Sequence, residues 1–289
     1  MKVKILIPIY NDWQSLIKIL ENINSEIANL EHDFSVIIVN DASTENRPEI
    51  SANVDNFISV KIINMKDNKG HARCNASGLK YIFEKEEFDY VIPMDGDGED
   101  RPEEIKLLLK KMSENPEKVI VGERIKRSES IFFKFCYFIH KIITLTFTGK
   151  SIKFGNYTCV PKLIVEKMIN EKATWSSFSG SLTKISVDRI ATPSIRGERY
   201  FGPTKMSFFK LLIHSLSIIS VFKYGVILRS LLFSLIYLFL VYPKITIITI
   251  IPIVFIIALI ISVLVISKRE NISEFDNSLS NIDNIKTIK

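Results

Sequence analysis

Residues 90–104 read YVIPMDGDGEDRPEE, an apolar run that stops at an acidic loop containing two glycines. Runs of this kind are typical of a buried strand followed by a ligand-binding turn. The carboxylates of Asp95, Asp97 and Glu99 alternate along the loop and can converge on one hard cation. A solvated acidic turn is the alternative interpretation. We favour the cation site and predict that these three residues bind Mg²⁺ or Mn²⁺, which commonly bridge to substrate phosphates.

The sequence on both sides of this stretch alternates between strand and helix patterns. Apolar runs predict further strands at residues 5–9, 34–39, 60–64 and 119–121. Helical spacing of apolar residues covers 15–27 and 72–83. This alternation predicts an α/β fold with a doubly wound, mostly parallel sheet. Polar clusters follow the strands at residues 10–12, 40–41, 67–68 and 95–97, at the edge where such sheets bind ligands.

Composition narrows the class of protein. The chain has 289 residues, a net charge of +6 and 47% hydrophobic residues, which excludes a disordered chain. Its three cysteines and four histidines form no CxxC or HxxxH pair, so we expect neither a disulfide framework nor a zinc site. Residues 199–269 contain eight Lys or Arg and no Asp or Glu. Because this basic stretch is also the most apolar, we predict contact with an anionic membrane and no nucleic-acid partner.

Two segments near the C-terminus have the character of membrane spans. Residues 245–267 carry no charge over 23 positions, more than the roughly 30 Å hydrocarbon core requires. Residues 225–242 are shorter and contain Arg229. Basic residues crowd at one end of the pair, which predicts a hairpin with both ends in the cytoplasm. Two buried core helices are the alternative. Residues 131–147 and 206–222 are apolar but interrupted by basic residues, so they lie either in the membrane interface or against the sheet.

Two further loops predict contacts with a nucleotide. Asp41 follows the second predicted strand and suits recognition of a base or ribose, or else a turn or helix cap. Residues 68–70 form a glycine-bearing loop that enters a helix, and Arg73 follows in that helix. Such a loop can hold a diphosphate through backbone N–H groups and a cationic side chain.

Taken together, these motifs resemble those of glycosyltransferase family 2, which has the GT-A nucleotide-sugar-binding fold. The matching stretches are residues 8–12, 39–43, 68–75 and 95–97. Within the family, residues 94–104, 121–124 and 199–205 are similar to motifs of membrane-anchored polyprenyl-phosphate sugar synthases of the dolichol-phosphate mannose synthase type. The resemblance covers about residues 1 to 267.

The resemblance implies a role for each matched residue. The nucleoside pocket would be lined by Pro8, Tyr10, Asp12 and Asp41. Arg73 would help there or at the diphosphate, and Asp95, Asp97 and Glu99 would hold the metal. Phosphate charge would be neutralised by Arg124, Arg199 and Lys205. We expect Asp97, Arg199 and Lys205 to be catalytic.

Two departures from the family pattern bear on the acceptor. Asn40 stands where relatives usually carry an aspartate, and residues 155–159 read GNYTC in place of their GDFRL. The acceptor is therefore left open between polyprenyl phosphate and another lipid-linked or glycolipid molecule. No residue stands out as a general base.

The resulting hypothesis is a metal-dependent, inverting glycosyltransferase that uses a nucleotide-sugar donor and a membrane-lipid-linked acceptor. The alternatives are a metal-dependent nucleotidyltransferase and a non-catalytic membrane partner of a lipid-carrier pathway. We expect a GT-A domain over residues 1–204, an amphipathic juxtamembrane segment over 205–224, a transmembrane hairpin over 225–267 and a polar, disordered cytoplasmic tail over 268–289. Homo-oligomerisation is left open.

Overall fold

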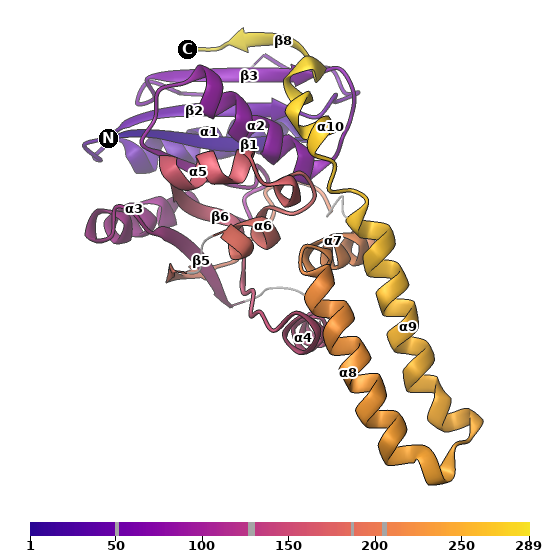
Figure 1. The fold of residues 1–289 in the computed structure, drawn as a ribbon. Coiled ribbons are helices and arrows are strands. Elements are labelled where there is room, and N and C mark those ends of the chain that lie inside the picture. Colours follow the sequence, from indigo (N-terminus) through magenta and orange to yellow (C-terminus); the bar gives the residue numbers. More distant parts are fainter. Residues whose placement is uncertain (50–51, 127–130, 186–187, 204–206) are drawn as a thin grey trace. The chain divides into compact units, whose positions relative to one another are not determined.

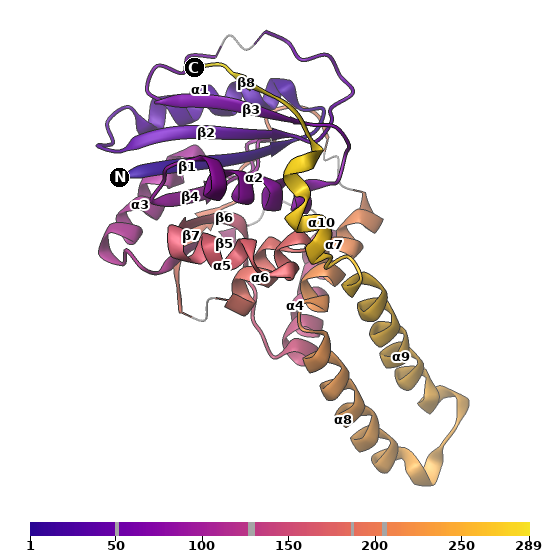
Figure 2. The same ribbon diagram turned by 45° about the horizontal axis from the view of Figure 1, so that its top comes forward.

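The chain folds around one eight-stranded sheet that contains the five strands predicted from the sequence and three others (Figure 1). The structure, a computed structural model, describes residues 1–49, 52–126, 131–185, 188–203 and 207–289. The strand order is β7-β5-β6-β4-β1-β2-β3-β8, which Figure 2 shows from β3 to β7. The five expected strands are β1 (Lys2–Ile9), β2 (Asp33–Asn40), β3 (Ser59–Met65), β4 (Tyr90–Pro93) and β5 (Val119–Lys126).

Three strands were not expected from the sequence. β6 (Phe154–Pro161) pairs antiparallel with β4 and β5, and β7 (Arg189–Ile195) runs parallel to β5. β8 (Ile282–Thr287) pairs antiparallel with β3. The remaining pairs, β1 with β2 and β4, and β2 with β3, are parallel. The expectation of a mostly parallel, doubly wound sheet is confirmed.

Helices cover both faces of the sheet because strand side chains alternate in direction. On β1, Val3, Ile5 and Ile7 point into a core with α1 (Trp13–Ile27) and α3 (Ile105–Glu114). Leu6 points the other way, into a core with α2 and the helices after β6. The helices on this face are α2 (His71–Lys85), α5 (Lys162–Ile169) and α6 (Phe178–Ile185), with the short 3₁₀ turn η2 (Lys172–Trp175). A second 3₁₀ turn, η1 (Pro102–Glu104), leads into α3 on the opposite face.

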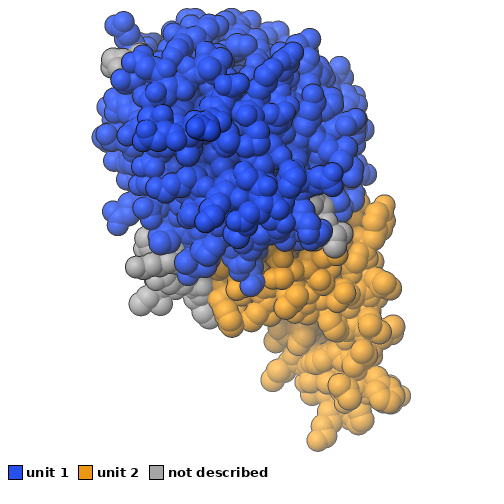
Figure 3. Space-filling view, turned by 90° about the vertical axis from the view of Figure 1, so that its left-hand side faces the viewer, with its two compact units in different colours: residues 1–128, 153–205, 271–289 blue, residues 129–152, 206–270 orange. Residues whose placement is uncertain are grey.

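Contacts divide the chain into two compact units, coloured separately in Figure 3. The first contains residues 1–128, 153–205 and 271–289, and therefore the whole sheet. The second contains residues 129–152 and 206–270. The expected domain over 1–204 thus contributes one helix, α4 (Ile131–Thr148), to the second unit. The boundary expected at residues 204–205 lies outside the described residues.

The second unit is helical and contains the predicted hairpin. Its other helices are α7 (Phe208–Ser220), α8 (Lys223–Val241) and α9 (Ile247–Ser267), with η3 (Tyr242–Lys244) joining the last two. In the described chain, two helical stretches are long and apolar enough to cross a membrane, Lys223–Lys244 and Ile247–Asp276. Val226, Leu259 and Val263 form a small core between helices, while most other apolar side chains of α8 and α9 are exposed. That exposure fits helices that face lipid.

The tail after α9 is ordered, so the expectation of disorder over residues 268–289 is wrong. It forms α10 (Ile272–Asp276), η4 (Ser278–Asn281) and β8, and it belongs to the first unit. Phe275 is fully buried and stacks on Trp175 with ring centroids 5.4 Å apart. The polar composition misled the prediction because β8 pairs with β3 through backbone hydrogen bonds, and none of its side chains is buried.

Candidate active site at the carboxyl ends of the strands

The polar clusters that follow β1, β2, β3 and β4 meet at one edge of the sheet. The Asp41 N–H donates to Ile9 O over 2.9 Å, which joins the loops after β2 and β1. His71, which follows the loop after β3, lies with Nε2 3.4 Å from Asp95 Oδ1 in the loop after β4. The predicted convergence at this edge is therefore present.

Asp41 holds the loop that begins α2. Its buried carboxylate accepts hydrogen bonds from the N–H groups of Lys69 (2.7 Å) and Gly70 (2.8 Å). Gly70 has φ of 91°, a left-handed conformation that glycine adopts without strain. This contact corresponds to the turn or cap role that the sequence left open. The nucleoside contact implied for Asp41 stays a prediction.

The acidic loop after β4 is held in shape by hydrogen bonds from its own backbone N–H groups to its own carboxylates. The Asp95 N–H donates to the Asp100 carboxylate over 2.9 Å, and the Glu99 N–H donates to Asp97 Oδ1 over 3.0 Å. Gly98 has φ of 93°, and a Cβ there would lie 2.8 Å from the Tyr200 ring. A glycine is therefore needed at position 98 for both the turn and the ring above it.

A second loop, residues 196–200, lies against the acidic loop. Arg199 bridges two carboxylates, reaching Asp12 Oδ2 over 2.6 Å and also pairing with Asp97. Arg196 pairs with Glu99. The N–H groups of residues 197 and 200 donate to the carbonyls of residues 99 and 97, each over 2.9 Å. The sequence analysis predicted a role for Arg199 but not for Arg196. The position of Arg196 just before the basic loop could have indicated that it also lies at the site.

His71 and Asn156 form a polar cluster with Asp95 that the sequence did not single out. Asn156 Nδ2 lies 2.7 Å from His71 Nε2 and 3.4 Å from Asp95 Oδ1. Asn156 is the residue that replaces the usual acid of the relatives. The substitution places a neutral amide beside the acidic loop and so leaves one carboxylate fewer there.

The carboxylates of this loop are crowded, and their pKa values show it. Burial, with the neighbouring charges of Asp95 and Glu99, raises the pKa of Asp97 to about 6. Burial and Asp95 raise the pKa of Asp100 to about 7. For Asp95, burial opposes ionisation, but His71 and Arg124 outweigh it and lower the pKa. Burial is the largest cause of both raised pKa values, so the loop holds its carboxylates in a poorly solvated place.

This donor set fits a hard divalent cation by type, since carboxylate oxygens are the ligands that Mg²⁺ and Mn²⁺ prefer. The raised pKa of Asp97 means that its ionised form is unfavourable in the fold, and a bound cation would make that form more favourable. In the described residues, no three His, Cys, Asp or Glu side chains stand together as a ready metal cage. In this conformation, Arg199 and Arg196 pair with Asp97 and Glu99.

The other predicted site residues are placed as follows. Pro8 is buried in β1, while Tyr10 at its end is 41% exposed. Arg124 lies 3.4 Å from Asp100 Oδ1, beside the acidic loop. Arg73 pairs with Glu274 over 3.4 Å and lies over the Trp175 ring. Lys205 lies outside the described residues.

Comparison with known proteins gives the family. The family model described as "Glycosyl transferase family 2" matches residues 4–161. The chain belongs to this family. The family 2 region spans the sheet from β1 to β6 and includes the acidic loop, although it ends before Arg196 and Arg199.

Curated relatives and solved structures extend this result. The chain is 29% identical over 222 residues to undecaprenyl-phosphate 4-deoxy-4-formamido-L-arabinose transferases of Serratia proteamaculans and Yersinia enterocolitica, covering 73% of this chain. It spans 64% of the length of these relatives.

Two solved structures share the fold at low identity. A mannosyltransferase from Pyrobaculum calidifontis in complex with GDP-Man and Mn²⁺ gives a TM-score of 0.50 at 13% identity, over 96% of this chain and 86% of that chain. Glucosyl-3-phosphoglycerate synthase from Mycobacterium tuberculosis, in complex with phosphoglyceric acid, gives 0.53 at 9% identity, over 78% and 79%. The GT-A fold expected from the motifs is confirmed.

Proposed function

We propose that this family 2 protein is a metal-dependent, inverting glycosyltransferase that moves a sugar from a nucleotide-sugar donor to a membrane-lipid-linked acceptor. The observation that carries the proposal is the pairing of the acidic loop 95–100 with the arginine-bearing loop 196–200 at the carboxyl edge of the sheet. An acidic loop suits a cation, and arginines suit a diphosphate, so one edge offers both partners of a nucleotide sugar.

The relatives support the choice of substrates. The curated relatives are named as undecaprenyl-phosphate sugar transferases, which favours a polyprenyl-phosphate acceptor. One structure with the same fold is a complex with GDP-Man and Mn²⁺, which favours a nucleotide-sugar donor and a divalent cation. We propose Mn²⁺ or Mg²⁺ as that cation, with Mn²⁺ as the first ion to test.

The chemistry follows from where charge develops. Breaking the sugar–phosphate bond leaves negative charge on the departing nucleoside diphosphate. The cation, held by Asp95, Asp97 and Glu99, would neutralise part of that charge. Arg199 and Lys205 would neutralise the rest, and Arg124 stands beside the same loop. An acceptor phosphate is already ionised, so the absence of a clear general base is compatible with it.

The membrane part of the proposal rests on unit 2. We propose that α8 and α9 cross the bilayer as a hairpin, and that α7 lies in the interface. Exposed apolar side chains on α7, including Phe209 at 75% exposed, give it a lipid-compatible face. Lys223, Lys268 and Arg269 lie at one end of the hairpin and Lys244 at the other, which favours cytoplasmic termini.

The experiment that tests the proposal measures donor turnover. The full-length protein in detergent is incubated with UDP-, GDP- and dTDP-sugars, with Mn²⁺, Mg²⁺ or EDTA, with and without undecaprenyl phosphate. We expect nucleoside diphosphate release from one donor class, dependent on a divalent cation and accelerated by the lipid. In a parallel incubation with nucleoside triphosphates and a sugar phosphate, release of pyrophosphate would indicate a nucleotidyltransferase instead. No turnover in either incubation would reject both enzymes.

A further inference from the structure

The segment that follows α9 reaches the carboxyl edge of the sheet through its last strand, β8. β8 runs antiparallel to β3 with Asn284 opposite Asn64. The segment is anchored upstream at α10, where Trp175 Nε1 donates to Glu274 over 3.0 Å and Phe275 is fully buried. Anchoring at α10 fixes the register in which Asn284 meets β3, because one slipped residue would turn its side chain to the other face.

A line of amide hydrogen bonds crosses three strands from this point. Asn64 donates to Asn284 Oδ1 over 2.8 Å, and Asn40 donates to Asn64 Oδ1 over 2.9 Å. Asn40 Oδ1 then accepts from the backbone N–H of Ser43 over 3.1 Å. Each middle member both donates and accepts, which an amide can do and an ionised carboxylate cannot. The line therefore gives a physical reason for asparagine at position 40.

The line ends in the loops proposed to hold the nucleoside. Ser43 Oγ accepts from the Asn11 N–H over 2.9 Å, and Asn11 Oδ1 accepts from the N–H groups of Thr44 and Glu45 over 2.8 and 3.1 Å. Asn11 and Ala42 have φ of 50° and 53°, a left-handed region that asparagine tolerates and that is unfavourable for alanine. Such backbone persists only where surrounding contacts hold it, and these hydrogen bonds are those contacts.

We infer that Asn284 is a positioning residue for the nucleoside part of the donor, acting through Asn64 and Asn40 on residues 41–45. The inference rests on the proposed function, since it concerns the pocket for a nucleoside diphosphate. Asn284 itself touches no substrate. Its effect is to hold the 41–45 loop in the shape that the donor requires, so its loss weakens donor binding and leaves the chemical step unchanged.

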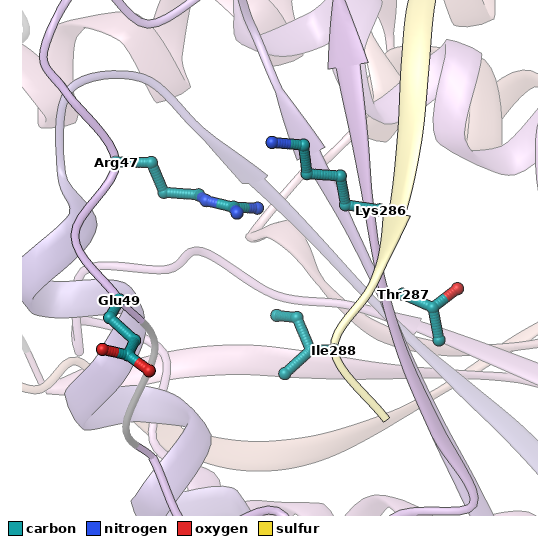
Figure 4. Close-up of a pocket in the computed structure, with 5 residues that line it drawn as sticks. All are labelled: Arg47, Glu49, Lys286, Thr287 and Ile288. Carbon is teal, nitrogen blue, oxygen red and sulfur yellow. The ribbon is translucent and has the colours of Figure 1, made fainter.

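The experiment compares two substitutions at one position. Asn284→Ala removes the acceptor for Asn64, whereas Asn284→Asp keeps an oxygen there. The matched control is Lys286→Ala on the same strand, whose side chain lines the groove with Arg47 in Figure 4 and has no part in the amide line. Affinity is measured by calorimetry on the full-length protein in Mn²⁺, using whichever of UDP, GDP and dTDP the wild type binds best.

We expect Asn284→Ala to weaken nucleotide binding and raise the donor KM about two- to tenfold with kcat unchanged, as for the loss of one hydrogen bond. Asn284→Asp and Lys286→Ala should match the wild type. Unchanged affinity in Asn284→Ala, or an equal loss in Asn284→Asp, would overturn the inference while the proposed function stands. If the wild type binds no nucleoside diphosphate, the proposed function fails and the inference fails with it.

Discussion

Substituting Asp97 by asparagine should make the protein more stable at high pH, although it removes a proposed metal ligand. A pKa of about 6 in place of 3.8 means that the folded state resists ionisation of this carboxyl. At 1.4 kcal/mol per pH unit, the ionised carboxylate costs the folded state about 3 kcal/mol at pH 8. Asparagine keeps an oxygen for the Glu99 N–H. It removes the cost of burying the charge and the repulsion from Asp95 and Glu99, which together outweigh the lost attraction to Arg199.

The sign of the pH dependence follows from proton binding. Between pH 4 and 6 the folded state holds a proton on Asp97 that the unfolded state has lost, so stability falls as pH rises through this window. The cost at pH 5 is therefore smaller than at pH 8, by roughly 1 kcal/mol. Asp97→Asn should gain that much more over wild type at pH 8 than at pH 5. For a protein of 289 residues, the extra gain corresponds to about 2 °C in Tm.

The assay is thermal unfolding of the full-length protein in detergent with EDTA, followed by tryptophan fluorescence at pH 5, 6, 7 and 8. Asp188→Asn is the control, because Asp188 is an exposed carboxylate paired with Lys118 at the surface. That variant should follow the wild-type pH profile. If Asp97→Asn loses as much stability between pH 5 and pH 8 as the wild type does, the reasoning that the ionised Asp97 carboxylate destabilises the folded state is refuted.

Three further outcomes are expected. Saturating Mn²⁺ should raise the Tm of wild type at pH 8 by several degrees and that of Asp97→Asn by much less; an equal rise would place the cation elsewhere. Arg199→Ala should lower kcat about 100-fold with little change in donor KM, because its charge is needed as the bond breaks, and a raised KM alone in steady-state kinetics would make Arg199 a binding residue. Replacing residues 225–268 by a short Gly-Ser linker, which the 3.8 Å approach of Lys223 Nζ to Glu270 Oε2 allows, should weaken flotation with anionic vesicles and slow lipid transfer yet keep donor hydrolysis; flotation and lipid transfer equal to wild type would contradict the hairpin anchor.

The parts of the fold that the sequence predicted are those specified by local pattern. The buried parallel strands β1 and β2 are continuous apolar runs, and α9 is an uncharged stretch long enough to be read by length alone. β8 escaped prediction because five of its six side chains are exposed, and its partner β3 lies more than 200 residues earlier in the chain. Only long-range backbone pairing specifies such a strand.

For the site, residue types were predictable and pairings were not. The alternation of carboxylates in the acidic loop indicated a cation-binding chemistry, and Arg199 was expected near phosphate charge. That Arg199 would bridge Asp12 and Asp97, and that Arg73 would turn toward Glu274, depends on loops that meet only in the folded chain. Asn40 was noted as a strand-end polar residue and as a departure from the family pattern, but nothing in the sequence linked it to Asn284, since the two are joined only through Asn64 in the folded sheet.

The ordered tail also constrains how the chain can meet a membrane. Unit 1 is built from residues on both sides of the hairpin, because β8 pairs with β3 and α10 buries Phe275. Because unit 1 contains chain segments from before and after the hairpin, both of these segments must lie on the same side of the membrane. The chain between residues 206 and 270 can therefore cross a bilayer only an even number of times. Among the described residues, two helices are long and apolar enough to do so, which makes the hairpin the insertion that keeps the sheet complete.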